Sequence, residues 1–416
     1  MQVLVIGYVW PEPDSSAAGS RMIQILEYFL STGYTVSFAT TASPSHWTSN
    51  LDAMGILTSQ IELNNSNFDF YLKGLNPDLV IFDRFMIEEQ FGWRVTKTCP
   101  DAIKILDTED LHFLRNFRER EYQGKTGNEG PGATEIAKRE IASIYRCDLS
   151  LIISEAEMKL LTEDFNISPG LLFYLPFLFE EITSTHINAL PGFENRKNFI
   201  SIGNFRHAPN VDAIINLKEH IWPLIHNELP NAKMEIYGAY PSARIEQLND
   251  FKRNFIIKGR AKDASEVVKK ARVSLAPIRY GAGLKGKLAE AMIYGTPSVT
   301  TTTGAEGMNG ELPWNGYIAN DPTEFAKAAV SLYTSPSLWQ QSCNKGFEII
   351  NSRFSKNGFY EKLNMRLIDL KLGIARHREL NFIGAMLVHH RVRSTYFLSK
   401  YIENKTELEK LKNLKK

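Results

Sequence analysis

The chain alternates short apolar segments with amphipathic helical segments, and it does so in two successive series. Helices of the first series are predicted, for example, at Ser20–Ser31, Thr134–Tyr145 and Glu155–Asp164. Its predicted strands lie at Val3–Gly7, Tyr34–Thr40, Asp78–Asp83, Ala102–Asp107, Leu149–Ser154 and Leu171–Leu175. Because strands that alternate with helices are usually joined by crossovers, this series predicts a parallel sheet covered by helices on both faces.

A second series follows the segment 180–198, which has mixed polarity, carries Pro191-Gly192 and is predicted to be a linker. Its predicted strands are Asn198–Phe205, Ala232–Gly238, Phe255–Gly259, Val273–Ile278 and Pro297–Thr302. Its predicted helices are Val211–Asn227, with Asn210 as N-cap, then Asp263–Ala271, Leu284–Tyr294 and Pro322–Tyr333. A chain of 416 residues exceeds what one core usually supports. We therefore expect two α/β domains, with a ligand cleft between the carboxyl ends of their sheets.

Composition and charge exclude several classes of function. The chain is 43% hydrophobic and 23% charged, which is ordinary for a globular protein, and its net charge of +1 does not indicate nucleic-acid binding. Cys99, Cys147 and Cys343 lie too far apart for a disulfide framework or a zinc site, so we expect no metal and a reducing compartment such as the cytoplasm. The N-terminus resembles a strand rather than a secretion signal, and no apolar run reaches the length of a transmembrane helix.

The last part of the chain differs from the rest in charge. Residues 371–416 hold eleven Lys and Arg against four Glu, a net charge of +7, so residues 1–370 carry about −6. Leu408, Leu411 and Leu414 have helical spacing. Two interpretations stay open: a solvated amphipathic helix packed on the body, or a basic surface that contacts anionic lipid or a partner.

The segment Arg279–Met308 carries the strongest indication of function. A predicted strand runs into the turn Gly281-Ala282-Gly283, and a helix with Lys285, Lys287 and Glu290 follows. Glycines leave backbone N–H groups open to a ligand, and a helix start adds positive potential. Lysines add charge for a phosphate, and a carboxylate one turn later can accept hydrogen bonds from ribose hydroxyls. The segment therefore predicts a site for a nucleoside diphosphate.

A dinucleotide site is the main alternative. Gly281, Gly283 and Gly286 satisfy the pattern G-x-G-x-x-G, and Glu306 lies 20 residues beyond Gly286. The match, however, follows the fourth strand of the second domain rather than a first strand, and lysines crowd the turn. Each feature also has a plain structural interpretation, in which the glycines only turn the chain and the charged side chains are solvated.

The segment resembles the nucleotide-sugar site of the GT-B glycosyltransferases of family 4, also called group 1. The features shared with that family are the glycine turn followed by Lys285-Gly286-Lys287, Glu290-Ala291-Met292, Gly295-Thr296-Pro297, Gly304-Ala305-Glu306-Gly307 and Asp107-Thr108-Glu109-Asp110-Leu111-His112. The resemblance implies two Rossmann-like domains that face each other across a cleft, followed by C-terminal helices. It places the acceptor-side domain at 1–183, the nucleotide-sugar domain at 184–352 and the helical extension with its basic tail at 353–416.

The resemblance also implies roles for single residues of the second domain. Glu290 is expected to bind the ribose, and the loop of Gly281 and Gly283 faces the transferred sugar and the phosphates. Many family members have a second glutamate where this chain has Ala282. The usual diphosphate-binding arginine and lysine are replaced as well, by Asn204 and Pro209. The candidates to supply the missing positive charge are Arg206, Lys285 and Lys287, and Glu306 is a further candidate contact of the donor.

In the first domain, the resemblance points to two loops that follow strands. The loop from Tyr8 to Arg21 corresponds to a glycine loop that faces the donor phosphate, with Gly19 at a helix start. Arg21 either reaches an anion or is an ordinary surface arginine. Asp110 and His112 follow the strand that ends at Asp107, and they are the candidate catalytic residues, although a structural role for His112 is an open alternative.

The resemblance implies a hexosyltransferase that moves a sugar from a nucleotide-diphosphate sugar to a hydroxyl. The resemblance implies retention of the anomeric configuration and no obligatory cofactor or metal. The expected acceptor is a glycan, a lipid-linked compound or a protein, as in polysaccharide biosynthesis. The expected location is the cytoplasm, at the inner face of the membrane if the basic tail contacts lipid. The alternatives are a GT-B epimerase that acts on the donor alone and a non-catalytic binding or scaffold subunit.

Overall fold

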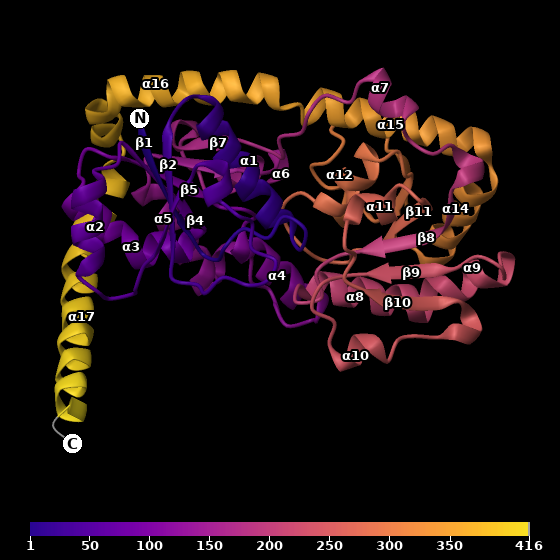
Figure 1. The fold of residues 1–416 in the computed structure, drawn as a ribbon, viewed down its shortest axis with the longest axis horizontal. Coiled ribbons are helices and arrows are strands. Elements are labelled where there is room, and N and C mark those ends of the chain that lie inside the picture. The colour runs from indigo at the N-terminus through magenta and orange to yellow at the C-terminus, as the bar shows by residue number, and fades with distance from the viewer. Residues whose placement is uncertain (415–416) are drawn as a thin grey trace.

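The computed structural model describes residues 1–414, without the side chains of 391–394, 413 and 414, and it contains two parallel sheets (Figure 1). The first sheet has the order β3-β2-β1-β4-β5-β6-β7. Its strands are β1 (Gln2–Gly7), β2 (Thr35–Thr40), β3 (Leu57–Gln60), β4 (Leu79–Asp83), β5 (Ile103–Asp107), β6 (Leu149–Ile152) and β7 (Leu172–Tyr174). In the middle of the sheet, Val3 of β1 is in register with Val36 of β2 and with Leu79 of β4.

The second sheet has the order β10-β9-β8-β11-β12-β13, and it is parallel throughout. Its strands are β8 (Lys197–Ile202), β9 (Met234–Tyr237), β10 (Phe255–Gly259), β11 (Ala271–Ala276), β12 (Ser298–Thr300) and β13 (Gly316–Ile318). Both sheets are buried on both faces, since alternate residues of one strand join different apolar cores. In β1, for example, Leu4 packs on one face and Val5 on the other.

Helices cover both faces of each sheet. In the first domain they are α1 (Ala17–Ser31), α2 (Asn67–Leu75), α3 (Phe85–Thr98), α4 (His112–Tyr122), α5 (Glu135–Arg146) and α6 (Glu155–Lys159), which continues as a π-helical turn (Leu160–Asp164). The connection and the second domain contain α7 (Ser184–Asn188), α8 (Ala208–Asn216), a π-helical turn (Leu217–Ile221), α9 (Trp222–Glu228), α10 (Ala243–Glu246), α11 (Ala264–Val268), α12 (Gly286–Ile293), α13 (Thr302–Ala305), α14 (Pro322–Thr334) and α15 (Pro336–Arg353). The chain ends with α16 (Lys356–Leu380) and α17 (Phe382–Leu414).

The chain passes between the two domains twice, and the two passages lie side by side. The N–H of Phe179 donates to the carbonyl of Phe354 over 2.8 Å, and the N–H of Lys356 donates to the carbonyl of Phe179 over 2.9 Å. Helix α16 then returns along the first domain, as Figure 1 shows, and Leu363 and Leu367 enter a core beneath the first sheet. The C-terminal extension is therefore a structural part of the first domain.

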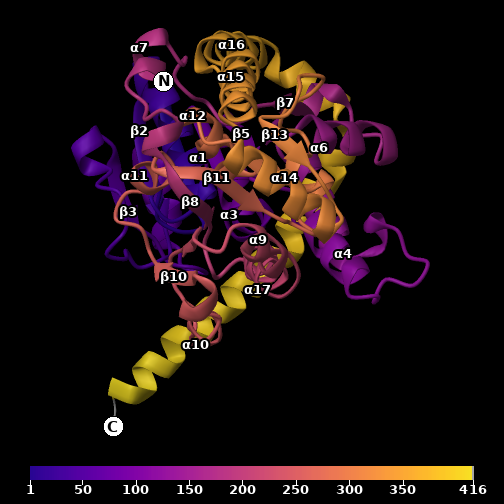
Figure 2. The same cartoon turned by 90° about the vertical axis from the view of Figure 1, so that its right-hand side faces the viewer.

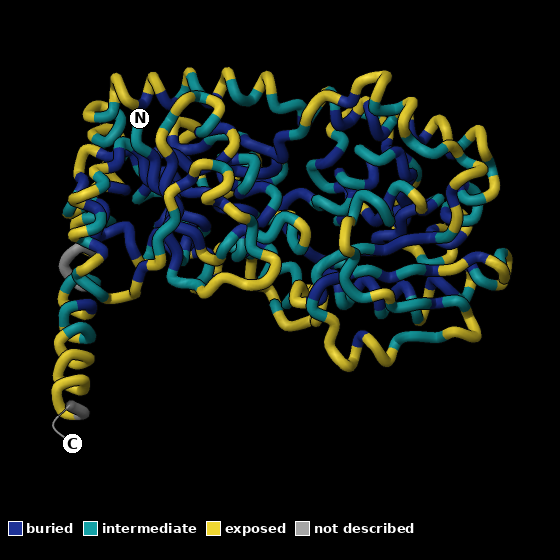
Figure 3. The backbone as a smooth tube through the Cα atoms, in the orientation of Figure 1, coloured by how far each residue is buried: buried dark blue, intermediate teal, exposed yellow. Residues whose placement is uncertain are grey.

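Helix α17 packs against α3 and α5 and then leaves the body of the molecule (Figures 2 and 3). Ser399 is buried, whereas residues 404–412 are all exposed. No helix among residues 1–414 is both long and apolar enough to cross a membrane.

The structure confirms the predicted fold class, including the helical extension, while the domain limits at 183 and 352 stay a prediction. Two strands went unpredicted. Strand β3 has a polar sequence, LTSQ, and lies at the edge of its sheet with half-exposed side chains, and β13 has only three residues. The predicted N-cap at Asn210 is wrong, because α8 begins at Ala208 and His207 occupies the N-cap. The side chain of Asn210 instead donates to the carbonyl of Asn204 over 2.9 Å.

A buried ion pair ties the first domain together beneath the cleft. The Arg21 guanidinium of α1 donates to the Asp107 carboxylate at the end of β5, over 2.8 Å from Nη2 and 3.1 Å from Nε. Its Nη1 donates to the carbonyl of Leu175, just beyond β7, over 2.6 Å. Neither sequence interpretation of Arg21 describes this position, because the side chain is fully buried and its donors are used inside the domain.

We predict that Arg21→Met destabilises the first domain by about 3–5 kcal/mol, because the Asp107 carboxylate remains buried without its cation. Chemical unfolding followed by circular dichroism measures this loss. The matched control is Arg206→Met, since Arg206 is exposed and should cost less than about 1 kcal/mol. Equal unfolding midpoints for the two variants would show that the buried pair contributes little.

Candidate functional site

The candidate site lies where the strand order reverses in each sheet. In the first sheet this point is between β1 and β4, and in the second it is between β8 and β11. Ligands of open parallel sheets bind beyond the carboxyl ends of such strands. The loops that follow these four strands all line one cavity of about 1120 Å³ between the domains. The cavity is therefore built from the switch points of both domains.

Glycines allow the second domain to approach the first closely. Gly283 has a φ of +63°, and a Cβ at this position would lie 2.8 Å from the Cβ of Asp110. A Cβ at Gly286 would lie 2.6 Å from the Cβ of Ala17, at the start of α1. Gly281 has a φ of +150°. A larger residue at 283 or 286 would force the domains apart, so these glycines do more than turn the chain.

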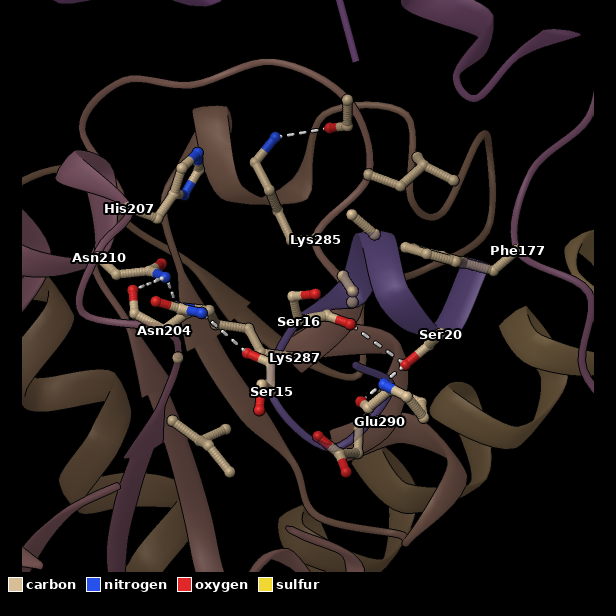
Figure 4. A pocket seen from close by; sticks show the side chains of 18 of the residues that line it. Ser15, Ser16, Ser20, Phe177, Asn204, His207, Asn210, Lys285, Lys287 and Glu290 are labelled. Atoms are coloured by element: carbon tan, nitrogen blue, oxygen red, sulfur yellow. Dashed lines mark hydrogen bonds between the residues drawn. The ribbon is translucent and has the colours of Figure 1, made fainter. Parts of the chain in front are cut away.

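Lys287 belongs to a chain of polar contacts that spans the cleft (Figure 4). Its ammonium donates to Oδ1 of Asn210 over 2.7 Å, and Nδ2 of Asn210 donates to the carbonyl of Asn204 over 2.9 Å. Nδ2 of Asn204 donates to the carbonyl of Ser15 in the first domain over 3.2 Å. Lys287 has no carboxylate partner among the described residues, and burial together with Lys285 lowers the pKa of its ammonium to about 8. It presents a positive charge that no acid of the described chain neutralises.

The other two basic candidates are placed differently. Lys285 lines the cavity, and its ammonium donates to the carbonyls of Gly283 over 2.6 Å and Ala282 over 3.2 Å. Burial lowers the pKa of Lys285, with the carboxylates of Glu306 and Glu157 opposing that effect. Arg206 is exposed where it lines the cavity, and its guanidinium lies 3.6 Å from the ring centre of Tyr240.

Glu290 lines the same cavity from α12 and makes no side-chain hydrogen bond to a described residue. Burial, with the nearby carboxylates of Asp263 and Asp14, raises the pKa of Glu290 to about 7. An unpaired, partly buried carboxylate is available to a ligand that donates hydrogen bonds. Its role in ribose binding stays a prediction.

The start of α1 faces the second domain. The N–H groups of Ala17 and Ala18 have no partner among the described residues, as expected in a first helical turn. The hydroxyl of Ser15 is buried without a partner, and Ser15 lines the cavity. Gly19 does not line the cavity, because its N–H donates to Ser16 over 3.0 Å and a Cβ would meet the Glu12 backbone at 2.5 Å. The donors that α1 presents to the cavity are therefore those before Gly19.

Asp110 and His112 lie together on the first-domain side of the cavity. Nε2 of His112 is 3.6 Å from Oδ1 of Asp110, and Arg115 forms an ion pair with the same carboxylate. Burial alone would raise the pKa of Asp110, but Arg115 and His112 outweigh it and lower the value to about 2. Burial also lowers the pKa of His112 to about 3, with Arg115 adding to the effect. The pair is therefore an ionised carboxylate beside a neutral imidazole.

Two lining residues that the sequence did not reveal have unusual backbones. Arg84 follows β4 with a φ of +72°, and Glu109 follows β5 with a φ of +62°. Both are non-glycine residues in the left-handed region, which costs free energy and is common at functional sites. In the sequence each of them follows a buried strand, and Glu109 also belongs to the segment 107–112 that resembles the glycosyltransferase family.

Glu306 lies outside this cavity, in a smaller groove. Its carboxylate pairs with both terminal nitrogens of Arg118, over 2.6 and 2.7 Å. Arg118 belongs to α4 of the first domain and also donates to the carbonyl of Gly281 over 2.8 Å. In this structure Glu306 joins the domains rather than facing the cavity with Glu290.

Part of the chain matches a family of known proteins. Residues 196–335, most of the second domain, match the family model described as Glycosyl transferases group 1. No curated protein matches the chain. The family match supports a glycosyltransferase domain in this part of the chain.

Solved structures resemble the whole fold. A mutant of S. aureus TarM, in complex with Fondaparinux, alpha-GlcNAc-glycerol and UDP, has 12% identity and a TM-score of 0.66 over 89% of this chain and 99% of its own. Anabaena HepE, in complex with UDP and glucose, has 11% identity and a TM-score of 0.63 over 88% and 99%. Sucrose-phosphate synthase from Thermosynechococcus elongatus has 14% identity and a TM-score of 0.66 over 89% and 99%. At this identity the likeness shows the GT-B fold.

Proposed function

We propose that the chain is a glycosyltransferase that moves a sugar from a nucleotide-diphosphate sugar to a hydroxyl acceptor. The observation that carries the proposal is that one cavity contains both the ammonium of Lys287, which no carboxylate of the described residues neutralises, and the carboxylate of Glu290, which has no partner among the described residues. A nucleotide-sugar offers complementary groups, since its diphosphate is anionic and its ribose hydroxyls donate hydrogen bonds. The TarM and HepE complexes contain UDP, so a uridine nucleotide is the first donor to test.

The proposed donor site uses both domains. Lys287, held by Asn210, contacts the diphosphate, and the open N–H groups of Ala17 and Ala18 at the start of α1 add positive potential from the opposite side. Glu290 accepts hydrogen bonds from the ribose. Such charges stabilise the diphosphate as it leaves, because they are already in place when its negative charge increases.

The proposed reaction retains the anomeric configuration. The bond between the anomeric carbon and the diphosphate oxygen breaks, and the acceptor oxygen forms a bond to the same carbon on the same face. The acceptor proton passes to the departing phosphate oxygen, so no side chain has to act as the base. Asp110 and the neutral His112 contact the sugar or the acceptor hydroxyl, and domain closure keeps water from hydrolysing the donor.

The proposal predicts that the purified protein slowly releases nucleotide from one member of a panel of UDP-, GDP- and ADP-sugars, and faster when a suitable glycan or lipid-linked acceptor is present. Nucleotide release measured by coupled assay and the sugar product measured by mass spectrometry are the readouts. A new sugar nucleotide without release would indicate an epimerase. If no donor binds or reacts, a non-catalytic subunit is the better account, and the lack of an acid at Ala282 would explain it.

The role of Glu290 predicts a change in the pH dependence of nucleotide binding. The ionised carboxylate accepts the ribose hydrogen bonds, so UDP affinity should fall as the pH drops below about 7, where free Glu290 becomes protonated. It should also fall as the pH rises above about 8, where Lys287 loses its charge. Glu290→Gln should weaken binding by about 1–3 kcal/mol at high pH and remove most of the dependence on the acid side.

Isothermal titration calorimetry of both proteins with UDP between about pH 6 and pH 9 measures this effect. The ratio of the two dissociation constants is the quantity of interest, because protonation of UDP itself affects both proteins equally. A ratio that does not change with pH would contradict the ribose role of Glu290.

We further propose that the C-terminal extension contacts an anionic membrane surface. Residues 371–416 have a net charge of +7, whereas residues 1–370 have a net charge of about −6. An anionic surface therefore attracts the end of the chain and repels the rest. Phe397, Tyr401 and Leu408 are 68%, 66% and 58% exposed, and their spacing places them along one side of α17. Such a helix is suited to lie at a membrane surface.

Deletion of residues 404–416 should reduce co-sedimentation with vesicles that contain phosphatidylserine, most clearly at low salt. Leu408→Ser with Leu411→Ser should reduce it without changing the charge. The control is Phe251→Ser, which removes a 74% exposed side chain from the other domain. Equal sedimentation of all variants would contradict lipid contact, and self-association lost on deletion would indicate a second copy as the partner.

A further inference from the structure

Glu157 is a fully buried carboxylate that the donor site as described above does not use. It lies on α6, directly after the first-domain strand β6. One of its oxygens, Oε1, accepts hydrogen bonds from two backbone N–H groups, that of Leu111 over 2.9 Å and that of Gly283 over 2.9 Å. The other oxygen is buried without a partner. Both hydrogen bonds of the carboxylate therefore go to these two loops.

The two loops belong to opposite domains. Leu111 lies between Asp110 and His112, the candidate catalytic residues, and immediately precedes α4. Gly283 belongs to the glycine loop of the second domain, and a Cβ there would lie 2.8 Å from the Cβ of Asp110 in the first domain. A single oxygen atom thus fixes the distance between the candidate catalytic loop and the loop proposed to face the donor sugar. The hydrogen bond to Gly283 joins the two domains, so it would be lost if they separated.

We propose that Glu157 is a positioning residue that couples closure of the domains to the assembly of the transfer site. This inference rests on the proposed function. When the domains close, the glycine loop gains a charge-assisted hydrogen bond from Gly283 to Glu157 and is held against Asp110. When they separate, the carboxylate loses one of its two donors. This hydrogen bond therefore favours the closed arrangement of the domains. It also holds the carbonyl groups of the glycine loop in the position proposed to face the donor sugar.

The surroundings of Glu157 make both hydrogen bonds important. Burial and the carboxylate of Asp110 raise the pKa of Glu157 to about 7, while its two N–H partners and Lys285 act in the opposite direction. Arg21, Arg118 and Glu140 also act on it through space. A buried carboxylate in this position depends on its two donors, because no water-exposed face compensates for their loss.

Glu140 offers a matched control. It too is a fully buried carboxylate, on α5, and it accepts N–H hydrogen bonds from His112 over 3.2 Å and Phe113 over 2.9 Å. It therefore supports the start of α4 much as Glu157 does. All of its partners, however, are in the first domain, so removing it tests local support without the contact between domains.

The experiment compares Glu157→Leu, Glu157→Asp and Glu157→Gln with Glu140→Leu. Leucine cannot accept a hydrogen bond, and aspartate is too short to reach both loops, so both should lower kcat by about tenfold or more. The UDP dissociation constant should rise by less than the fall in kcat, about threefold at most, since Lys287 and Glu290 keep their contacts in the second domain while only the N–H groups of Ala17 and Ala18 move away. Glutamine keeps an oxygen that can accept both hydrogen bonds, so the kcat of Glu157→Gln should lie within about threefold of the wild-type value. Glu157→Asp keeps the test valid if the leucine variant does not fold.

A second readout does not need catalysis. Small-angle scattering with saturating UDP should give a larger radius of gyration for Glu157→Leu and Glu157→Asp than for the wild type and Glu140→Leu. This holds even if no sugar donor is found, so failure of the proposed function and failure of this inference remain distinct. Unchanged compactness and kcat in both variants, or an equal loss in Glu140→Leu, would overturn the inference.

Discussion

The close approach of the glycine loop to the first domain is the constraint on which the site depends. Gly283 and Gly286 have no room for a Cβ because Asp110 and Ala17 occupy that space. At this distance the N–H of Gly283 reaches Glu157. The cavity has its present shape because the backbone of the glycine loop contacts the first domain directly, where a side chain at Gly283 or Gly286 would hold the domains apart.

The charge of the cavity depends on which acidic and basic side chains are neutralised by partners in the protein. Glu306 and Glu290 come from the same segment of sequence, yet Arg118 neutralises the first and no side chain that the structure describes pairs with the second. The Lys285 and Lys287 ammonium groups are held by oxygens of carbonyl and amide groups rather than by carboxylates. The cavity thus offers positive charge at Lys285 and Lys287 and an unpaired carboxylate at Glu290, which suits a ligand with an anionic diphosphate and a donor-rich sugar.

Much of the fold and part of the site could be predicted from the sequence, because both depend on local patterns. Buried parallel strands are continuous apolar runs, so the central strands were found. Strands β3 and β13 lie at sheet edges with half-buried or exposed side chains, so neither has such a run. The glycine turn, the lysines and Glu290 lie within ten residues of one another, and their spacing indicated their chemistry.

What the sequence could not predict are contacts between distant residues. Arg21 pairs with Asp107 across 86 positions, Lys287 is held by Asn210 across 77, and Gly283 binds Glu157 across 126. The identity of a charged residue does not indicate whether its side chain forms a buried ion pair, joins two domains or binds a ligand. Its role is decided by its neighbours in space, which is why the sequence did not reveal that Arg21 is buried or that Glu306 binds Arg118.

The most direct test of the account is a crystal structure of the chain with the nucleoside diphosphate that it binds most tightly. We expect the diphosphate oxygens within hydrogen-bonding distance of the Lys287 ammonium and the ribose hydroxyls on the Glu290 carboxylate, with Gly283 still bound to Glu157. A nucleotide seated elsewhere, or one whose phosphates approach neither lysine, would contradict the central claim that this cavity is a nucleotide-sugar site.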